Sequence, residues 1–316
     1  MAAELLPVTV VIPTRDRAAA LRRTFESLAE QSSQPAELRI VDASTDGSTR
    51  SLCEEESIPK LRSAVSWCQA DVAGAASQRN QGVRAASQSM IGFMDDDVLL
   101  EPDCFARLWR ALNSDDRMGG VNAMITNQRY QSPGRISRFV FRLMDGHAES
   151  SYAGRVLGPA VNLLPEDRED LPEVVPVEWL NTTCTLYRRE ALPDPPFPEH
   201  FQGYSLMEDV TLSLTVGRHW KLANARTARI YHDSQPGSHK GDPNLIAEMQ
   251  LTNRHYVMTK VLGRSQISDY FKLFLFEMFS LASILQVPSG RAVFVPTLRG
   301  RAKATWSILM RRRLRP

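Results

Sequence analysis

The sequence predicts an α/β protein with a mostly parallel central sheet, followed by a helical C-terminal region. Short β-branched runs alternate with amphipathic stretches over residues 1–125, which is typical of βαβ units. Polar residues follow the ends of those runs, whereas apolar and basic segments fill residues 236–316. With 316 residues, of which 43% are hydrophobic and 23% are charged, the chain can bury a full core.

Short apolar runs, each followed by polar residues, predict the strands of the sheet. We expect strands at Val8–Ile12, Leu38–Asp42, Val65–Trp67, Ile91–Met94, Val121–Ile125, Val177–Tyr187 and Arg226–His232. Between the first two, Leu21, Phe25 and Leu28 recur at helical spacing, with Asp16 as the expected N-cap. A second helix is expected after Ala76.

The later part of the chain is expected to be less regular. Residues 130–176 are rich in Gly, Pro and charge, which predicts an irregular surface excursion. Helical stretches follow at 244–262 and 269–287. The second is densely apolar, but Lys272 and Glu277 interrupt it and it does not exceed the ~20 residues of a membrane-spanning helix. A transmembrane helix is therefore the less favoured interpretation of this stretch.

Charge and cysteine content restrict the function classes. The formal net charge of +2 argues against nucleic acid as the main partner. The four cysteines, Cys53, Cys68, Cys104 and Cys184, form no CxxC pair, so neither a zinc site nor a disulfide framework is indicated. In the N-terminal run MAAELLPVTVVIPTRDR, Glu4 precedes a short apolar run that ends in charge, which is typical of a first strand rather than a signal peptide. These features predict a protein of the reducing cytosol.

Basic residues follow residue 287 with no acidic residue among them, interleaved with Trp306, Ile308 and Leu309. They are Arg291, Arg299, Arg301, Lys303, Arg311, Arg312, Arg313 and Arg315. This combination is typical of a segment that lies on an anionic membrane surface, at about 1 kcal/mol per basic residue. A solvated basic tail or a nucleic-acid contact is the alternative.

Asp95, Asp96 and Asp97 stand in a row where an apolar run ends, in MIGFMDDDVLL. Carboxylates about 5 Å apart repel by roughly 3 kcal/mol at an effective dielectric of 20, so the triplet needs either water or a cation. The two interpretations are a solvated turn and a metal site. Residues elsewhere in the chain decide between them.

Other expected strands also end in polar residues, and ligands of open α/β sheets bind beyond the carboxyl ends of the strands. The residues there are Pro13, Thr14 and Arg15 in VVIPTRDR and Asp42 in IVDASTDGS. Arg79 and Asn80, in AASQRNQG, precede the fourth strand, where a cation suits a diphosphate. Each stretch taken alone also matches an ordinary loop.

Taken together, these stretches resemble the inverting family-2 glycosyltransferases of the GT-A fold. The resemblance runs through VVIPTRDR, VDASTDGS, AASQRNQGVRAA and IGFMDDDVLLEPD, and continues in EWLNTTCTLYRREAL, GYSLMEDVTLSL and ARIYHD. No single motif is decisive, but the whole series in this order is specific. The resemblance implies a GT-A type nucleotide-binding domain over residues 1–235. Residues 236–316 then form a C-terminal helical, basic and aromatic region that associates with the membrane.

The resemblance implies roles for the polar residues at the strand ends. Asp42 is similar to the acidic residue that contacts the nucleobase, and Thr14 lies in the loop that borders it. Arg79 resembles the basic residue near the base and the diphosphate. The remaining residues implied for the nucleotide-sugar site are Pro13, Arg15, Asn80, Asp95 and Asp96.

In this resemblance, Asp95 and Asp97 fill the two ends of a DxD element. Asp97 is the expected direct metal ligand, Asp95 binds the metal or acts through the sugar or water, and Asp96 faces the ribose. Carboxylate oxygens suit Mg²⁺ or Mn²⁺, and such a cation stabilises the diphosphate that leaves when a glycosyl phosphate bond breaks. His232 in ARIYHD is a further candidate ligand, although isolated histidines are commonly structural.

An acceptor hydroxyl that attacks the anomeric carbon must lose its proton to a carboxylate opposite the leaving group. Glu208 and Asp209 in MEDVTL match the ED element of the family, whose Asp is the base. Without the resemblance, the same pair is typical of acidic residues at a helix N-terminus. Trp179 offers a flat face to the acceptor or is a buried core residue.

Alternatives to this function remain at the level of sequence. Asn181, Thr182 and Thr183 stand where the family often has a Gly-Ala pair, so the identity of the donor sugar is not carried over. A sugar nucleotidyltransferase would need a glycine-rich phosphate loop, but IPTRDRAAA contains no glycine. A non-catalytic membrane scaffold would have no need for three separate active-site aspartates.

The sequence thus predicts a metal-dependent inverting glycosyltransferase that moves a sugar from a nucleotide-diphosphate sugar to a saccharide or lipid-linked acceptor. Mn²⁺ or Mg²⁺ is the expected cofactor, and cell-surface polysaccharide or glycan synthesis is the expected context. An anionic membrane is the expected partner surface, with the protein held peripherally at its cytoplasmic face.

Overall fold

The computed structural model describes residues 3–54, 57–146, 149–234, 241–286 and 290–313, except for the side chains of residues 311–313. The chain divides into two compact units. The sheet unit comprises Met1–Tyr130 and Leu164–Gln235, and the helical unit comprises Gln131–Leu163 and Pro236–Pro316. Residues 131–163, which the sequence assigned to the domain over residues 1–235, thus group with the C-terminal helices.

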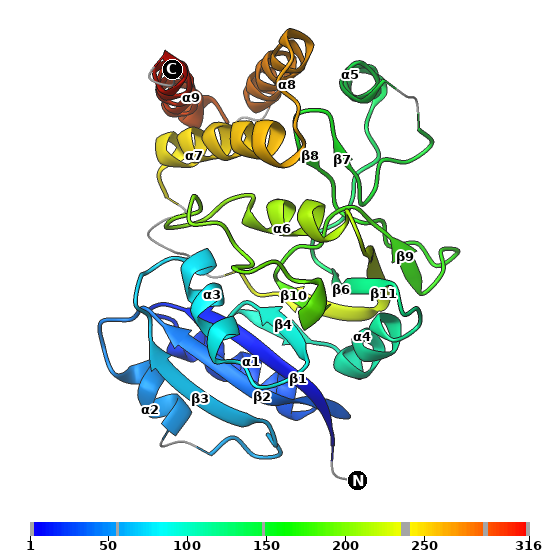
Figure 1. The fold of residues 1–316 in the computed structure, drawn as a ribbon, viewed down its shortest axis with the longest axis vertical. Helices are drawn as coiled ribbons and strands as arrows, with labels where there is room; N and C mark the ends of the chain where they lie inside the picture. The colour runs from blue at the N-terminus through cyan, green and yellow to red at the C-terminus, as the bar shows by residue number, and fades with distance from the viewer. Residues whose placement is uncertain (1–2, 55–56, 147–148, 235–240, 287–289, 314–316) are drawn as a thin grey trace. The chain divides into compact units, whose positions relative to one another are not determined.

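The sheet unit is built on a sheet with the strand order β3-β2-β1-β4-β10-β6-β11-β5, and β9 pairs with β11 (Figure 1). The strands are β1 (Glu4–Thr14), β2 (Ser33–Asp42), β3 (Ala64–Gln69), β4 (Met90–Met94), β5 (Val98–Leu100), β6 (Met118–Ile125), β9 (Val174–Pro176), β10 (Cys184–Arg188) and β11 (Lys221–His232). The first four strands pair in parallel, as do β6 and β11, whereas β10 runs antiparallel between β4 and β6. The predicted α/β fold with a mostly parallel central sheet is confirmed.

The sheet unit also contains five helices among its described residues, and the first four along the chain contact the sheet. The five are α1 (Ala18–Ala29), α2 (Ser48–Glu54), α3 (Ala75–Ala85), α4 (Cys104–Leu112) and α6 (Glu208–Val216), with a 3₁₀ turn at Arg189–Ala191. In α1, Leu21, Phe25 and Leu28 are buried, as their spacing predicts. In α3, a Cβ on Gly82 would overlap the Val11 side chain, so this helix lies close against β1.

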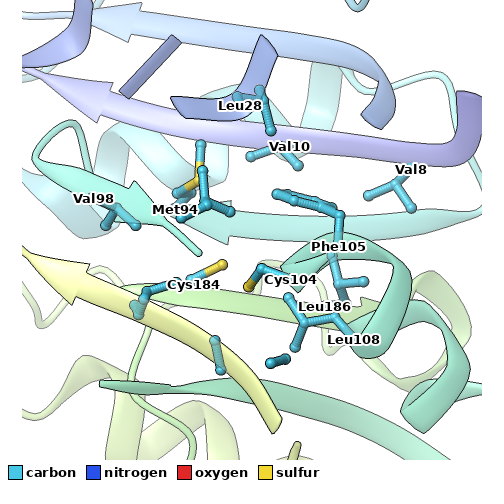
Figure 2. Close-up of a cluster of buried hydrophobic side chains, with 14 of the residues drawn as sticks. Val8, Val10, Leu28, Met94, Val98, Cys104, Phe105, Leu108, Cys184 and Leu186 are labelled. Atoms are coloured by element: carbon cyan, nitrogen blue, oxygen red, sulfur yellow. The ribbon is translucent and has the colours of Figure 1, made fainter. Parts of the chain in front are cut away.

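The hydrophobic core of the sheet unit contains two cysteines that face each other. Figure 2 shows the sulfur atoms of Cys104 on α4 and Cys184 on β10 pointing toward one another, with Met94, Phe105 and Leu186 around them. Both thiols are free. The hydrogen bond with Cys184 and burial raise the pKa of Cys104 well above its ordinary value, so this thiol stays protonated and unreactive at neutral pH.

The helical unit has its own apolar clusters. Its elements are α5 (Arg135–Asp145), β7 (Val156–Leu157), β8 (Val161–Asn162), α7 (Pro243–Tyr256), a π-helical turn at Val257–Val261, α8 (Ile267–Leu285) and α9 (Gly290–Arg313). Val140, Phe141 and Met144 of α5 pack with β7 and β8 and against Phe276 and Phe279 of α8. A second cluster joins α7, α8 and α9 through Leu251, Leu273 and Ala304. Among the helices of the described residues, none has both the length and the apolar character needed to cross a membrane.

Three predictions of local structure are wrong. The predicted strand Val177–Tyr187 is a strand only from Cys184 onward, within β10. Residues 135–145, predicted to be irregular, form α5 because its apolar residues supply a buried face. Asp16 does not cap α1, since it has a left-handed backbone with φ 57° and its N–H donates to Ser44 Oγ at 2.7 Å.

Candidate active site

Asp42, at the end of β2, is buried and fixed through both carboxylate oxygens. Its Oδ1 accepts hydrogen bonds from the Ser44 N–H and hydroxyl, and its Oδ2 accepts one from Trp67 Nε1 at 3.1 Å. The register of β2 and β3 pairs Ile40 with Trp67, which places the indole on the same face of the sheet as Asp42. The Arg50 guanidinium lies 5.1 Å from the centroid of the Trp67 ring. An aromatic ring, a cation and an oriented carboxylate therefore lie together at this strand end.

Asp96 connects the ends of β1 and β4. Thr14 Oγ1 donates a hydrogen bond to Asp96 Oδ2 at 2.6 Å. Arg17 Nη1 lies 3.2 Å from Asp96 Oδ1 and 3.3 Å from Asp97 Oδ2. Burial raises the pKa of Asp96 to about 6, although the Thr14 hydroxyl and Arg17 both act to lower it. Arg17 thus offsets part of the carboxylate charge in the turn between β4 and β5.

Asp95, Asp97 and His232 each bring one ligand atom within 4.8 Å of the others. The antiparallel pairing of β11 with β5 places His232 opposite Val98, directly beside Asp97. Two carboxylates and an imidazole form a donor set that suits Mn²⁺ and also accommodates Mg²⁺. The residues present therefore fit the expected divalent cation.

The hydrogen bonds of His232 determine which of its nitrogens can bind a metal. Its Nε2 lies 3.1 Å from Asp97 Oδ1, and its Nδ1 lies 3.1 Å from Gln128 Nε2. For Nε2 to bind a metal, the proton must be on Nδ1 and must be donated to the Gln128 amide oxygen. A flip of the Gln128 amide supplies that acceptor, since its oxygen and nitrogen are assigned from the hydrogen-bond network alone.

Arg79 of α3 is almost fully buried and bridges two carboxylates. Its Nη2 donates to Asp95 Oδ1 at 2.8 Å, and its Nη1 donates to Glu208 Oε1 at 3.1 Å. The guanidinium carbon lies 5.8 Å from the centroid of the Phe197 ring. Arg79 therefore connects the candidate metal ligands at the end of β4 with the acidic pair that begins α6.

Glu208 and Asp209 occupy the first turn of α6, where the helix dipole favours negative charge. Asp209 Oδ2 accepts a hydrogen bond from Trp179 Nε1 at 3.0 Å, and its Oδ1 accepts one from the Val210 N–H at 2.7 Å. Burial raises the pKa of Asp209, against the lowering effect of the Trp179 hydrogen bond. Burial and the Asp209 charge raise the pKa of Glu208, against the lowering effect of Arg79. A carboxylate with a raised pKa is a stronger base once it is ionised.

The structure brings most of the residues singled out in the sequence into hydrogen-bonded clusters at the strand ends and leaves three others aside. Asn80 uses both ends of its amide on the main chain of Phe197. Arg15 is exposed and lies 3.5 Å from Asp16, and Pro13 is partly buried with no polar side chain. The roles of these three in nucleotide-sugar binding stay predictions. Trp179 is buried with its indole on Asp209, and a contact with the acceptor stays a prediction.

Sequence reasoning missed three side chains that support the site: Arg17, Trp67 and Gln128. Arg17 lies in the same PTRDR stretch as Thr14, so its position in that loop was a usable signal. Trp67 was assigned only to a strand, yet the side-chain alternation of two parallel strands predicts that it shares a face with Asp42. Nothing in the sequence indicated that Gln128 would contact His232.

This fold and this site define a glycosyltransferase of the GT-A class. The model of Glycosyl transferase family 2 matches residues 9–193, which is more than half of the chain. The protein belongs to this family, and the resemblance found in the sequence is confirmed.

Individual relatives are distant. Validoxylamine A glucosyltransferase of Streptomyces hygroscopicus subsp. limoneus is 36% identical over 97 residues, which span 30% of this chain and 21% of that protein. The mannosyltransferase PcManGT of Pyrobaculum calidifontis, solved with GDP-Man and Mn²⁺, is similar with a TM-score of 0.58 and 16% identity over 95% of this chain and 87% of that chain. GalNAc-T7, solved with UDP, GalNAc and Mn²⁺, has a TM-score of 0.52 and 17% identity over 84% of this chain and 53% of that chain. At such identities the two structures support the shared fold.

Proposed function

We propose that the protein is a metal-dependent, inverting glycosyltransferase that uses a nucleotide-diphosphate sugar and a saccharide or lipid-linked acceptor. The observation that carries the proposal is the cluster of Asp95, Asp97 and His232 at the end of β4. Arg79 donates both to Asp95 and to Glu208, which precedes Asp209 at the start of α6. A solvated turn would not explain why an imidazole from a distant strand lies against Asp97. Solved relatives of the same fold that carry a nucleotide sugar or nucleotide with Mn²⁺ support the proposal.

The strand ends of β1 and β2 supply the nucleotide site in this proposal. Asp42 accepts a donor group of the base, because Ser44 and Trp67 hold its carboxylate in one orientation. Asp96 accepts from the ribose, and Thr14 keeps that carboxylate in place. Thr14 and Arg17 both act to lower the pKa of Asp96 against the effect of burial, which favours the ionised form that accepts hydrogen bonds.

Asp97, Asp95 and His232 would hold the divalent cation. When bound there, the cation offsets the negative charge that the nucleoside diphosphate gains as it leaves. Arg17 lies within 3.3 Å of a carboxylate oxygen of both Asp96 and Asp97, so it is the side chain that must move or share these carboxylates when cation and donor bind.

Asp209 acts as the general base. The acceptor hydroxyl gives its proton to the Asp209 carboxylate while its oxygen forms a bond to the anomeric carbon. The bond from that carbon to the phosphate oxygen breaks, and its electron pair leaves with the nucleoside diphosphate. Attack from the face opposite the leaving group inverts the anomeric centre. Trp179 keeps one Asp209 oxygen engaged and leaves the carboxylate oriented for the acceptor.

The C-terminal region bears on where the enzyme would meet its acceptor substrate. We propose that residues 236–316 associate with an anionic membrane at the cytoplasmic face, where the enzyme works in cell-surface polysaccharide or glycan synthesis. Basic residues on α9, with no acidic residue between Gly290 and Arg313, support this attraction. Arg315, which the sequence included in the basic set, lies outside the described residues, and so do the side chains of residues 311–313.

A thermal-shift panel of nucleoside diphosphates and nucleotide-diphosphate sugars, run with Mn²⁺, with Mg²⁺ and with a chelator, tests the donor and metal sites. We expect stabilisation by one nucleotide only in the presence of metal, because the diphosphate completes the coordination. Asp97→Ala should lose that stabilisation, whereas Asp116→Ala, at an exposed aspartate, should keep it. The absence of any nucleotide effect on the folded wild-type protein, with either metal, would contradict the proposal and favour a non-catalytic scaffold.

A further inference from the structure

Large apolar side chains are exposed mainly in the helical unit. In the described part of the sheet unit, the exposed ones are Leu5, Val72, Tyr204 and Tyr231. In the described part of the helical unit they are Ile136, Phe139, Leu143, Leu245, Ile267, Phe271, Phe274, Met278, Leu285, Val295, Leu298, Trp306 and Leu309. Soluble surfaces rarely gather so many large apolar side chains without a partner, so this distribution indicates an interaction surface.

Helix α5 shows the pattern most clearly, because it has two different apolar faces. Val140, Phe141 and Met144 are buried in the unit. Ile136, Phe139 and Leu143, spaced by three and four residues, form a separate stripe with exposures of 74%, 63% and 47%. A helix that only covered its own core would have polar residues at these positions.

Helices α8 and α9 carry stripes of the same kind. On α8 the exposed stripe consists of Ile267, Phe271, Phe274, Met278 and Leu285. On α9 it consists of Val295, Leu298, Trp306 and Leu309. Spacings of three, four and seven or eight residues place each set along one side of its helix. Contacts join α5 to α8 and α8 to α9, and Figure 1 shows these three helices in a row.

The charges that flank these stripes are basic. Arg135, Arg138 and Arg142 are exposed on α5 at the same spacing as its apolar stripe. On α9, Arg291 and Arg299 are exposed, and no acidic residue occurs in that helix. The acidic residues of α8 are engaged: the Asp269 carboxylate accepts from the N–H at the helix start, and Glu277 lies between two arginines. Apolar stripes beside exposed cations are typical of helices that lie in the headgroup region of an anionic bilayer.

We propose that the stripes of α5, α8 and α9 form one apolar layer that inserts into the interface of an anionic membrane, with the α5 stripe as an essential part of it. This inference rests on the proposed membrane association of residues 236–316 and extends it to a helix from the middle of the chain. A second copy of the chain fits this surface less well, because its arginines would face like charges. Insertion of the three stripes fixes the helical unit on the membrane without a spanning helix.

Co-sedimentation of the full chain with vesicles tests the layer. The probes are vesicles of phosphatidylcholine with phosphatidylglycerol and vesicles of phosphatidylcholine alone. We expect Ile136→Ser/Phe139→Ser to lower the partition onto anionic vesicles at least tenfold, because both side chains are exposed and no core contact is lost. The matched control Leu5→Ser/Val72→Ser, in the sheet unit, should bind as the wild type does.

The charge component has its own pair of variants. Arg135→Glu/Arg138→Glu/Arg142→Glu should lower binding to anionic vesicles by tenfold or more and have little effect on phosphatidylcholine alone. Arg84→Glu/Arg110→Glu/Arg117→Glu makes the same change in net charge on the sheet unit and should have a much smaller effect. Nucleotide-dependent thermal stabilisation, measured on every variant, should be unchanged.

Two outcomes overturn the proposal. If wild-type protein binds anionic vesicles and both α5 variants bind equally well, α5 is not part of the membrane surface, although the C-terminal region is. The second outcome is that wild-type protein does not bind vesicles and light scattering shows a dimer. If Phe139→Ser dissociates that dimer, the apolar layer is an interface between copies of the chain. If nucleotides with metal do not stabilise the wild-type protein at all, that result contradicts the proposed enzymatic function and not the membrane layer.

Discussion

Each unit contains a cluster of three largely buried charges, and the two clusters have opposite composition. In the sheet unit, Arg79 lies between Asp95 and Glu208, so one cation faces two carboxylates. In the helical unit, Glu277 lies between Arg254 and Arg301, so one carboxylate faces two cations. The first cluster has an excess of negative charge beside further aspartates, which suits a cation. In the second cluster the single carboxylate is already paired with two arginines, so the cluster is best explained as an ion-pair network that holds the helices together.

The contacts of the two clusters support this distinction. In the helical unit, Arg254 Nη1 donates to the Ala160 carbonyl at 2.8 Å, and Arg301 donates to the Glu277 carbonyl and Ser280 Oγ at 2.6 and 3.0 Å. These bonds connect α7 to the turn between β7 and β8 and connect α9 to α8, and the ion pair of Arg254 with Glu277 joins α7 to α8. In the sheet unit, the Asp95 side chain keeps 27% of its surface exposed and so is open to a ligand. Buried charge therefore connects helices in the helical unit, whereas in the sheet unit it lies at the proposed site of catalysis.

The largest expected effect is the loss of the base. Asp209→Asn should reduce transfer by about 10³-fold, because general base catalysis contributes roughly 10²–10⁴-fold. Donor binding should be preserved, and the free energy of unfolding should fall by about 1–2 kcal/mol, because the amide oxygen can still accept from Trp179 but the amide nitrogen cannot accept from the Val210 N–H. Steady-state kinetics, nucleotide thermal shifts and urea unfolding measure the three quantities.

The control is Asp116→Asn, the same substitution at an exposed position of the sheet unit, which should leave all three quantities unchanged. A variant Asp209→Asn that unfolds easily but turns over normally would reverse the comparison. The acidic pair of α6 would then be a structural element like Glu277.

The second effect concerns stability. Glu277→Gln removes the carboxylate between two buried arginines and should lower the free energy of unfolding of the helical unit by about 3 kcal/mol. Burial lowers the pKa of Arg254 to about 10 even though Glu277 acts to raise it, so the charge of this arginine should become more costly when Glu277 is replaced. Hydrogen exchange should become faster in α7, α8 and α9 and stay unchanged in the sheet.

Glu248→Gln provides the matched control, because Glu248 pairs with Lys303 at 3.3 Å on the surface of the same unit. An exposed pair of this kind contributes less than about 1 kcal/mol, so hydrogen exchange should change little. Equal effects of the two substitutions would show that the buried cluster has no special structural role.

The strands of the sheet could be predicted from the sequence because the pattern of apolar and polar residues that specifies each strand lies within a few neighbouring residues. Runs such as Val8–Ile12 and Ile91–Met94 are largely apolar and lead into polar segments, and they lie within β1 and β4. The carboxyl ends of parallel strands meet at one edge, so Thr14 and the aspartates after β4 could be expected to lie together. Physical rules of this kind need no knowledge of distant contacts.

Other features of the fold and the site could not be predicted, because they depend on contacts between distant parts of the chain or lie in a segment whose composition indicated a loop. His232 meets Asp97 only because β11 pairs antiparallel with β5, a contact that no local signal encodes. Helix α5 was missed because the Gly, Pro and charged residues around it indicated an irregular segment. The helical period of RISRFVFRLMD, which gathers its three arginines on one side and its apolar residues on the other, was a usable local signal. Which part of this wide apolar side is buried depends on distant contacts.

The smallest expected effect tests how finely the sheet unit tunes its carboxylates. Trp179→Phe removes the indole N–H that donates to Asp209 Oδ2 at 3.0 Å. This hydrogen bond lowers the pKa of Asp209 against the effect of burial, so its loss should raise that pKa further. A hydrogen bond to a charged group contributes roughly 1.5–3 kcal/mol, which corresponds to a shift of about one to two pH units.

The acid limb of kcat/KM against pH should therefore move to higher pH by about one to two units, because Asp209 must be ionised to accept the proton. At high pH, where the base is ionised in both proteins, the rates should approach each other. Trp109→Phe, the same substitution at a partly buried position of α4, should lower stability slightly and leave the pH profile in place. A uniform fall in rate at every pH in Trp179→Phe would mean that Trp179 acts on the acceptor or on packing rather than on the ionisation of Asp209. The contrast between the buried charges of the sheet unit and those of the helical unit would then be weaker, because the Trp179–Asp209 hydrogen bond would not be needed to set the ionisation of the base.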